Sequence, residues 1–233
     1  MKPMVLPEKH EPSASDGDAA LQWLSASSDV FRGLNHSLSN RMLSLEMLST
    51  VAERGEDVDD DLLAIVAGEA GRFRTLLKLY RVMESSDRTA SEPALIGDIL
   101  PDAIALFGYD SVLRDTRIAL APIGDLAPVL LQPSACVQSL LVALIAVARV
   151  IPREEQVGIV VRCSGDAEWV TVTVSTAAPV PELAQEGREL IAVPWLLRRT
   201  PSASAWERLS DGTVRAVVRL GTLSNVRRRE REG

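Results

Sequence analysis

A stripe of apolar residues with helical spacing runs through the first quarter of the chain. One set repeats at every seventh position and a second set fills spacings of three and four: Leu24, Phe31, Leu38, Leu45 and Ala52, then Leu34, Met42 and Leu48. Such a repeat is typical of a helix that lays one face against a partner helix. A long coiled-coil-like helix is therefore expected, and it needs a partner to cover its stripe.

A second helix is predicted to supply that partner. Gly55 and the acidic residues 56–61 interrupt the first helix, and acidic side chains favour the positive end of a helix dipole. A stripe with alternating spacings of four and three follows: Leu62, Val66, Glu69, Phe73, Leu76, Tyr80 and Met83. Residues 17–88 should form an antiparallel hairpin. One hairpin offers too little apolar area to stand alone, so a homodimer with a four-helix bundle is expected.

The pattern changes after residue 88, and residues 92–222 are predicted to form an α/β domain, which makes the fold class α+β. Helices are expected at 95–108, 133–150 and 182–199, and valine-rich strands at 116–121, 157–163, 169–175 and 213–220. Residues 133–150 are nearly all apolar, so this helix should be buried. Residues 1–16, rich in Pro, Ser and acidic residues, are expected to be a disordered arm, and residues 223–233 a solvated charged tail.

Composition excludes several classes of protein. The net charge of -7 argues against a nucleic-acid-binding role, which needs Lys and Arg to neutralise phosphates. Two cysteines and two histidines, without ligand spacing, predict neither a zinc site nor a disulfide framework. No apolar run is long enough to cross a bilayer and the N-terminus lacks a signal core, so no membrane association and a cytoplasmic location are expected.

His36 is the candidate nucleophile. It falls on the side of the first helix opposite Phe31 and Leu38, and a neutral imidazole facing solvent on a rigid helix is a usable nucleophile at neutral pH. Asn40 lies one turn further along the same face. A surface histidine without a role is the alternative interpretation.

The order of helix, acidic loop, helix and α/β domain resembles the phosphotransfer and ATP-binding domains of histidine kinases. Residues 34–42, LNHSLSNRM, resemble the phosphoacceptor box H-[ED]-L-x-N-P-L, although Ser37 replaces the acid and Arg41 the proline. The resemblance implies that His36 is the phosphoacceptor and that Asn40 stands where kinases place a water-orienting residue. Loss of the acid counts against autophosphorylation and less against exchange with an aspartyl phosphate.

The second half resembles a histidine-kinase-like (Bergerat or GHKL-type) domain that has lost its nucleotide residues. Residues 138–147 resemble the helix Q-x-L-x-N-L-x-x-N-A, with Val142 and Ala146 in place of the asparagines. Residues 172–180 resemble V-x-V-x-D-x-G-x-G, with Thr176 in place of the aspartate and Ala178 and Val180 in place of glycines. No glycine-rich lid is recognisable. The resemblance implies no ATP binding, no metal and no cofactor; an unrelated α/β domain is the alternative.

Over residues 18–221 the chain is similar to histidine phosphotransferases of the ChpT type. That resemblance implies a two-component phosphorelay in which His36 carries phosphoryl groups between the receiver domains of response regulators. Two alternatives stay open: a non-catalytic pseudokinase scaffold that dimerises and binds a signalling partner, and an active kinase with a divergent ATP site. P-loop, Rossmann and G-x-S-x-G patterns are absent from the sequence.

Overall fold

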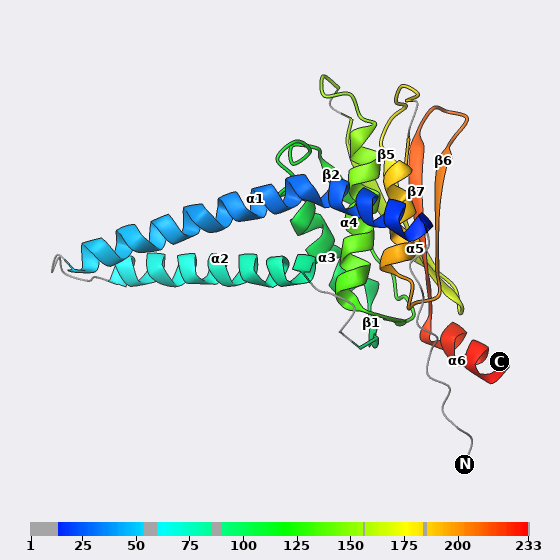
Figure 1. Cartoon of the computed structure of the whole chain (residues 1–233), viewed down its shortest axis with the longest axis horizontal. Coiled ribbons are helices and arrows are strands. Elements are labelled where there is room, and N and C mark those ends of the chain that lie inside the picture. Colours follow the sequence, from blue (N-terminus) through cyan, green and yellow to red (C-terminus); the bar gives the residue numbers. More distant parts are fainter. Residues whose placement is uncertain (1–13, 54–59, 85–89, 156, 184–185, 233) are drawn as a thin grey trace, which may run out of the picture.

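The computed structural model describes residues 14–53, 60–84, 90–155, 157–183 and 186–232. Two long helices, α1 (Ala14–Glu53) and α2 (Asp60–Glu84), lie side by side and project as an arm from an α/β sandwich (Figure 1). The predicted hairpin is therefore present, followed by the predicted α/β domain. Residues 14–16 of the predicted disordered arm are instead the first residues of α1, and residues 1–13 of that arm and 55–59 of the predicted break lie outside the described residues.

Helix α1 buries one continuous face along its length. The first half of that face, Ala19, Trp23, Ala26, Val30 and Leu34, is buried, and the second half continues through the partly buried Leu38, Arg41, Leu45 and Leu48. The first half packs on the α/β sandwich and the second half on α2. The sequence pattern predicted only the second of these contacts, because it placed Leu24 on the seam. Leu24 is 60% exposed in the single chain, as is Met42 at 59%.

The sandwich has one five-stranded sheet in the order β2-β4-β5-β7-β6. Its strands are β2 (Ile118–Leu120), β4 (Ile159–Gly165), β5 (Trp169–Thr176), β6 (Ser202–Arg208) and β7 (Val214–Gly221). β2 and β4 are parallel and the other pairs are antiparallel. Alternate residues of β5 are buried, as expected for a sheet with one covered face. Two short strands, β1 (Glu92–Ala94) and β3 (Val129–Leu131), form a separate pair.

Helix α4 (Pro133–Arg149) fills the middle of the molecule. It contacts β5 and β7 on one side and α3 (Ile96–Phe107) on another, and every residue from Cys136 to Ala148 is buried. Its burial raises the pKa of the Cys136 thiol to about 12. The core around α4 continues without interruption into Trp23 and Leu34 of α1 and Met83 of α2. The hairpin and the sandwich therefore share one hydrophobic core.

Several segments differ from the sequence predictions. The predicted helix at 182–199 is reduced to a single 3-10 turn, η1 (Arg188–Ile191), and the short helix α5 (Ala192–Leu196). Strands β1, β3 and β6 were not predicted. The predicted charged tail forms helix α6 (Leu223–Glu232), which is anchored by the buried Asn225 and by an ion pair between Arg228 and Glu168. No helix among the described residues is long and apolar enough to cross a membrane.

Candidate functional site

His36 lies on α1 at the point where the helix leaves the sandwich. Leu34, two residues earlier, is buried in the shared core, whereas His36 is exposed. The predicted position of His36, on the face opposite the apolar stripe, is what the structure shows. A rigid helix fixed on one side by the core therefore presents an imidazole to solvent on the other.

Asn40 is the neighbour of His36 that can set its protonation pattern. The Asn40 Nδ2 atom lies 3.2 Å from Nδ1 of His36. An amide end can present either its NH2 donor or its oxygen acceptor to that nitrogen, because the two atoms differ by a rotation of the side chain. When the oxygen faces the ring, Nδ1 carries the proton and Nε2 keeps a lone pair for nucleophilic attack.

A pocket of about 430 Å³ opens beside His36, between α1 and the loop that follows α3. The helix contributes Gly33, His36 and Ser37, and the loop contributes Tyr109, Ser111 and Arg114. Nothing in the sequence pattern pointed to this loop, because its residues are far from His36 in the chain. The pocket makes the candidate site a junction between the hairpin and the sandwich.

Arg41, which replaces the proline of the kinase box, turns away from the site towards α2. Its Nη1 donates to both carboxylate oxygens of Glu69, at 3.0 and 2.8 Å, and Arg72 donates to the same carboxylate at 2.8 Å. The hydrogen bond from Arg41 holds the pKa of Glu69 below its usual value. Arg41 therefore ties the two helices together, and α1 continues unbroken past the box.

The residues that the sequence resemblance aligns with nucleotide-binding positions of kinases take part in packing. Val142 and Ala146 are buried within α4, and η1 and α5 pack against that helix. The Thr176 hydroxyl accepts a hydrogen bond of 3.2 Å from the backbone N–H of Val214. Gln138 at the start of the kinase-like helix donates to the carbonyl oxygens of Val82 and Met83, at 2.7 and 3.3 Å, so it secures the end of α2.

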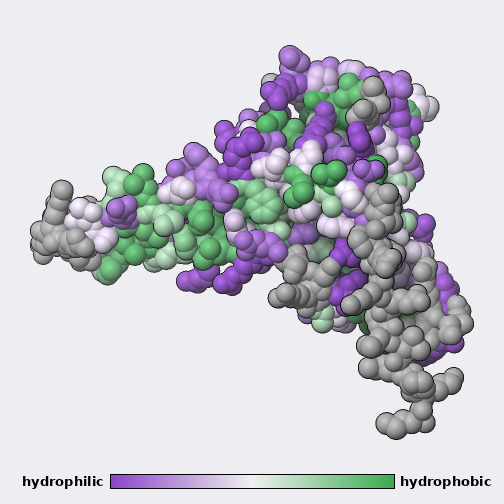
Figure 2. Space-filling model, viewed as in Figure 1, coloured by the Kyte–Doolittle hydropathy of each residue, from purple (hydrophilic) through white to green (hydrophobic). Residues whose placement is uncertain are grey.

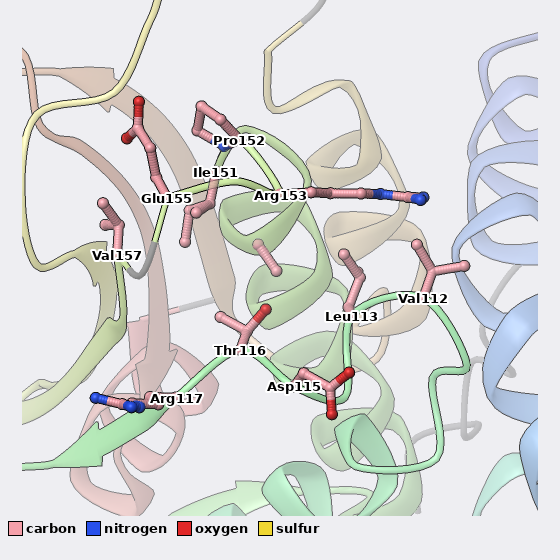
Figure 3. Close-up of a pocket in the computed structure, with 11 residues that line it drawn as sticks. Val112, Leu113, Asp115, Thr116, Arg117, Ile151, Pro152, Arg153, Glu155 and Val157 are labelled. Carbon is pink, nitrogen blue, oxygen red and sulfur yellow. The ribbon is translucent and has the colours of Figure 1, made fainter.

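A second cavity, of about 480 Å³, lies between the loop after α3 and the loop after α4 (Figure 3). Its charged lining residues are Asp115, Arg117, Arg153 and Glu155, so both signs of charge are present. None of the residues predicted from the sequence lines it. The mixed charge gives no preference for an anionic or a cationic ligand.

Comparison with known proteins gives likeness of fold only. No protein-family model and no curated protein matches the chain. Solved structures that match include a histidine kinase from Burkholderia phymatum (12% identity over 88% of this chain and 97% of that chain, TM-score 0.46). Others are histidine kinase AdeS from Acinetobacter baumannii (11%, 81% and 98%, 0.46) and a bacterial phosphotransferase (15%, 84% and 96%, 0.42). At TM-scores below 0.5 these likenesses carry no conclusion about function, which rests on the residues described above.

Proposed function

We propose that the chain is a histidine phosphotransferase that relays phosphoryl groups between response-regulator receiver domains in the cytoplasm. His36 takes the phosphoryl group from an aspartyl phosphate on one receiver and donates it to an aspartate on another. The observation that carries the proposal is an exposed His36 whose ring contacts Asn40 at the mouth of an open pocket. Phosphoryl transfer asks a protein mainly for positioning and charge stabilisation, and this site offers both.

Asn40 serves the proposed reaction as a positioning residue. With its amide turned so that the oxygen, in place of Nδ2, faces the ring, Asn40 accepts a hydrogen bond from the Nδ1–H group and leaves the Nε2 lone pair free. Nε2 attacks phosphorus, the N–P bond forms, and the P–O bond to the aspartate carboxylate breaks with its electron pair leaving on oxygen. The ring becomes positive during attack, and the Asn40 oxygen stabilises it. Asn40 thereby supplies part of what the missing acid at Ser37 would supply.

The absence of a nucleotide step is also part of the proposal. Magnesium triphosphate needs a polar cradle with oxygen ligands. The corresponding positions hold buried apolar residues at Val142 and Ala146, and the Thr176 hydroxyl is engaged with Val214. A kinase must also move its ATP-binding domain to its histidine, whereas here both parts share one core.

A homodimer follows from the far half of the hairpin. Large apolar side chains are exposed there on both helices: Met42, Leu43 and Met47 of α1, and Leu63, Ile65 and Val66 of α2. Figure 2 shows hydrophobic surface along the arm that the two helices form. A patch of this kind marks an interaction surface. Its presence on both helices, with Met42 from the predicted stripe among its members, favours a second copy of this chain, in a four-helix bundle.

The test mixes the purified dimer with a panel of phosphorylated receiver domains and follows label onto it. Wild-type protein should take label, His36→Ala should take none, and Asn40→Asp, which keeps an acceptor at this position, should retain more transfer than Asn40→Ala. Circular dichroism checks that all variants are folded. Label on His36→Ala equal to wild type would overturn the proposal.

A pseudokinase scaffold is the second candidate, and the packed nucleotide positions together with the exposed apolar arm favour it. It predicts a folded dimer that binds a receiver or kinase but takes no label, with binding unchanged in His36→Ala. An active kinase, by contrast, predicts saturable binding of Mg-ATP and label from ATP itself. The three outcomes exclude one another.

A further inference from the structure

The loop that follows α3 is held rigidly against α1 beside His36. A Cβ atom at Gly33 would overlap the carbonyl oxygen of Tyr109, so only glycine lets the loop approach this closely. The buried Asp110 closes the turn: its Oδ1 accepts hydrogen bonds from the backbone N–H groups of Val112 and Leu113, both at 2.9 Å. The backbone N–H of Arg114 donates to the Asp110 carbonyl oxygen at 3.0 Å.

This turn places Arg114 on the wall of the pocket that His36 also lines. The charged residues among the described lining of this pocket are Arg32 and Arg114, and no Asp or Glu lines it. Its other cation, Arg32, is engaged with Asp29 at 2.7 Å. Within the part of the chain that the structure describes, the Arg114 guanidinium makes no hydrogen bond or ion pair.

A phosphoryl group on His36 would fit in this pocket, beside the wall that carries Arg114. The pocket volume is about 430 Å³, whereas one water molecule occupies roughly 30 Å³ in the liquid. The pocket therefore has ample room for the three phosphoryl oxygens. An arginine suits phosphate because its fork of N–H groups matches two oxygens at once. The turn already fixes the backbone of Arg114, so only its side chain has to be ordered on making that contact.

We propose that Arg114 is the residue that binds the phosphoryl group on His36 of the same chain. The hairpin supplies the nucleophile and the sandwich supplies the charge that stabilises the phosphorylated state. This inference rests on the proposed phosphotransfer by His36. It gives the sandwich a direct part in the chemistry, made by a side chain outside the region that resembles the nucleotide site.

Phosphoramidate, a small phosphoryl donor, tests the contact without a receiver. Its P–N bond breaks with ammonia as the leaving group, a ring nitrogen of His36 forms the new N–P bond, and the ring proton passes to solvent. Arg114→Ala should label His36 about tenfold more slowly than wild type, because one charged donor to the reacting group is lost at an exposed site. Arg114→Lys, which keeps the charge, should recover part of that rate.

Two controls separate the contact from general effects. Arg117→Ala removes an exposed cation that lines the second cavity and points away from α1 (Figure 3). His36 of this variant should therefore be labelled at the wild-type rate. Added salt should slow the wild type and leave Arg114→Ala nearly unchanged, because exposed charges are screened. Equal labelling rates for wild type and Arg114→Ala would overturn the proposed role of Arg114 and leave the proposed function standing. The same would follow if Arg117→Ala slowed labelling as much as Arg114→Ala does. No label on wild-type His36 would overturn the proposed function with it.

Discussion

The two halves of helix α1 use the same kind of apolar pattern for different purposes. Residues 14–34 bury their face in the core of the sandwich, with Trp23 only 8% exposed. Residues 35–53 have α2 as their neighbour within the chain, and Met47 is 64% exposed. The buried face of the first half has its partners within one chain, although Leu21 and Leu24 on its other side are exposed, whereas the second half leaves apolar surface on both helices of the hairpin for the proposed second copy. His36 lies just past the boundary between them.

The difference teaches how a site can be rigid and still accessible. Burial of the first half fixes the axis of the helix, and the exposed position of His36 just beyond it leaves the ring open to a partner. A fixed nucleophile needs less ordering when a receiver docks, which favours transfer.

The largest expected effect comes from shortening a large side chain on the buried face of residues 14–34. Trp23→Ala should lower the free energy of unfolding by about 3 kcal/mol, because a large buried side chain leaves a cavity. Denaturant unfolding followed by circular dichroism at constant protein concentration measures it. Leu21→Ala, a change on the same helix at a residue 62% exposed, should cost less than about 1 kcal/mol. Equal losses would mean that the two sides of this half do not differ in burial.

Charge on the far half should break the dimer and spare the fold. The double variant Met42→Glu, Met47→Glu should dimerise at least about a hundredfold more weakly than wild type. The reason is that each of these Met side chains, once covered by the second copy, contributes about 1.5 kcal/mol or more to dimerisation. Sedimentation velocity measures the change. Leu183→Glu, at an exposed apolar residue of the sandwich, is the matched control and should remain dimeric. A wild-type chain that is monomeric at all concentrations would refute the interpretation of this surface.

Substitution of Gly33 tests how closely the loop after α3 packs on α1 at the boundary between its two halves. Gly→Ala inside a helix normally stabilises by up to about 1 kcal/mol. Here the added methyl would overlap Tyr109, so Gly33→Ala should destabilise by about 1–3 kcal/mol. Gly71→Ala in α2, where a Cβ meets nothing within 4 Å, should show the normal gain. Thermal unfolding of both variants decides; a gain at Gly33 would show that the loop yields.

The smallest expected effect is a pH dependence of the hairpin. The pKa of Glu69 is lowered, chiefly by the hydrogen bond from Arg41, so the ion pair stabilises the fold above the usual value of 4.5. This contribution is lost as pH falls through the lower pKa of the folded state. Wild type should therefore exceed Glu69→Gln in unfolding free energy at pH 7, and the gap should close in acid. A gap that is constant down to pH 3 would contradict the assignment.

Regular elements with strong periodicity were predictable from the sequence. The buried helix at 133–150 and the strands at 157–163, 169–175 and 213–220 correspond closely to α4, β4, β5 and β7, because apolar runs and alternation reflect burial directly. Strand β6 was missed because residues 202–208 carry small and charged residues, and the strand is specified by pairing with β7. The shortening of the 182–199 helix likewise reflects packing on α1 and α4.

The candidate site was predictable in one part only. The placement of His36 and Asn40 on one helical face follows from their spacing of four residues. Arg114 could not be found in this way, because its approach to His36 depends on how the α3 loop packs at Gly33. The sequence offered one local sign, a glycine inside a helix, and such a residue often marks a close backbone approach.

The contact between the start of α1 and the short helices η1 and α5 has a consequence for synthesis. Trp23 is made about 165 residues before its partners in η1, and at 5–20 residues per second the ribosome needs roughly 8–33 seconds to reach them. During that interval the part of the apolar face of α1 that η1 and α5 cover in the folded chain stays open. A molecular chaperone that recognises apolar helices would therefore be expected to engage this chain early, and premature termination before residue 188 would leave a product with that face still open.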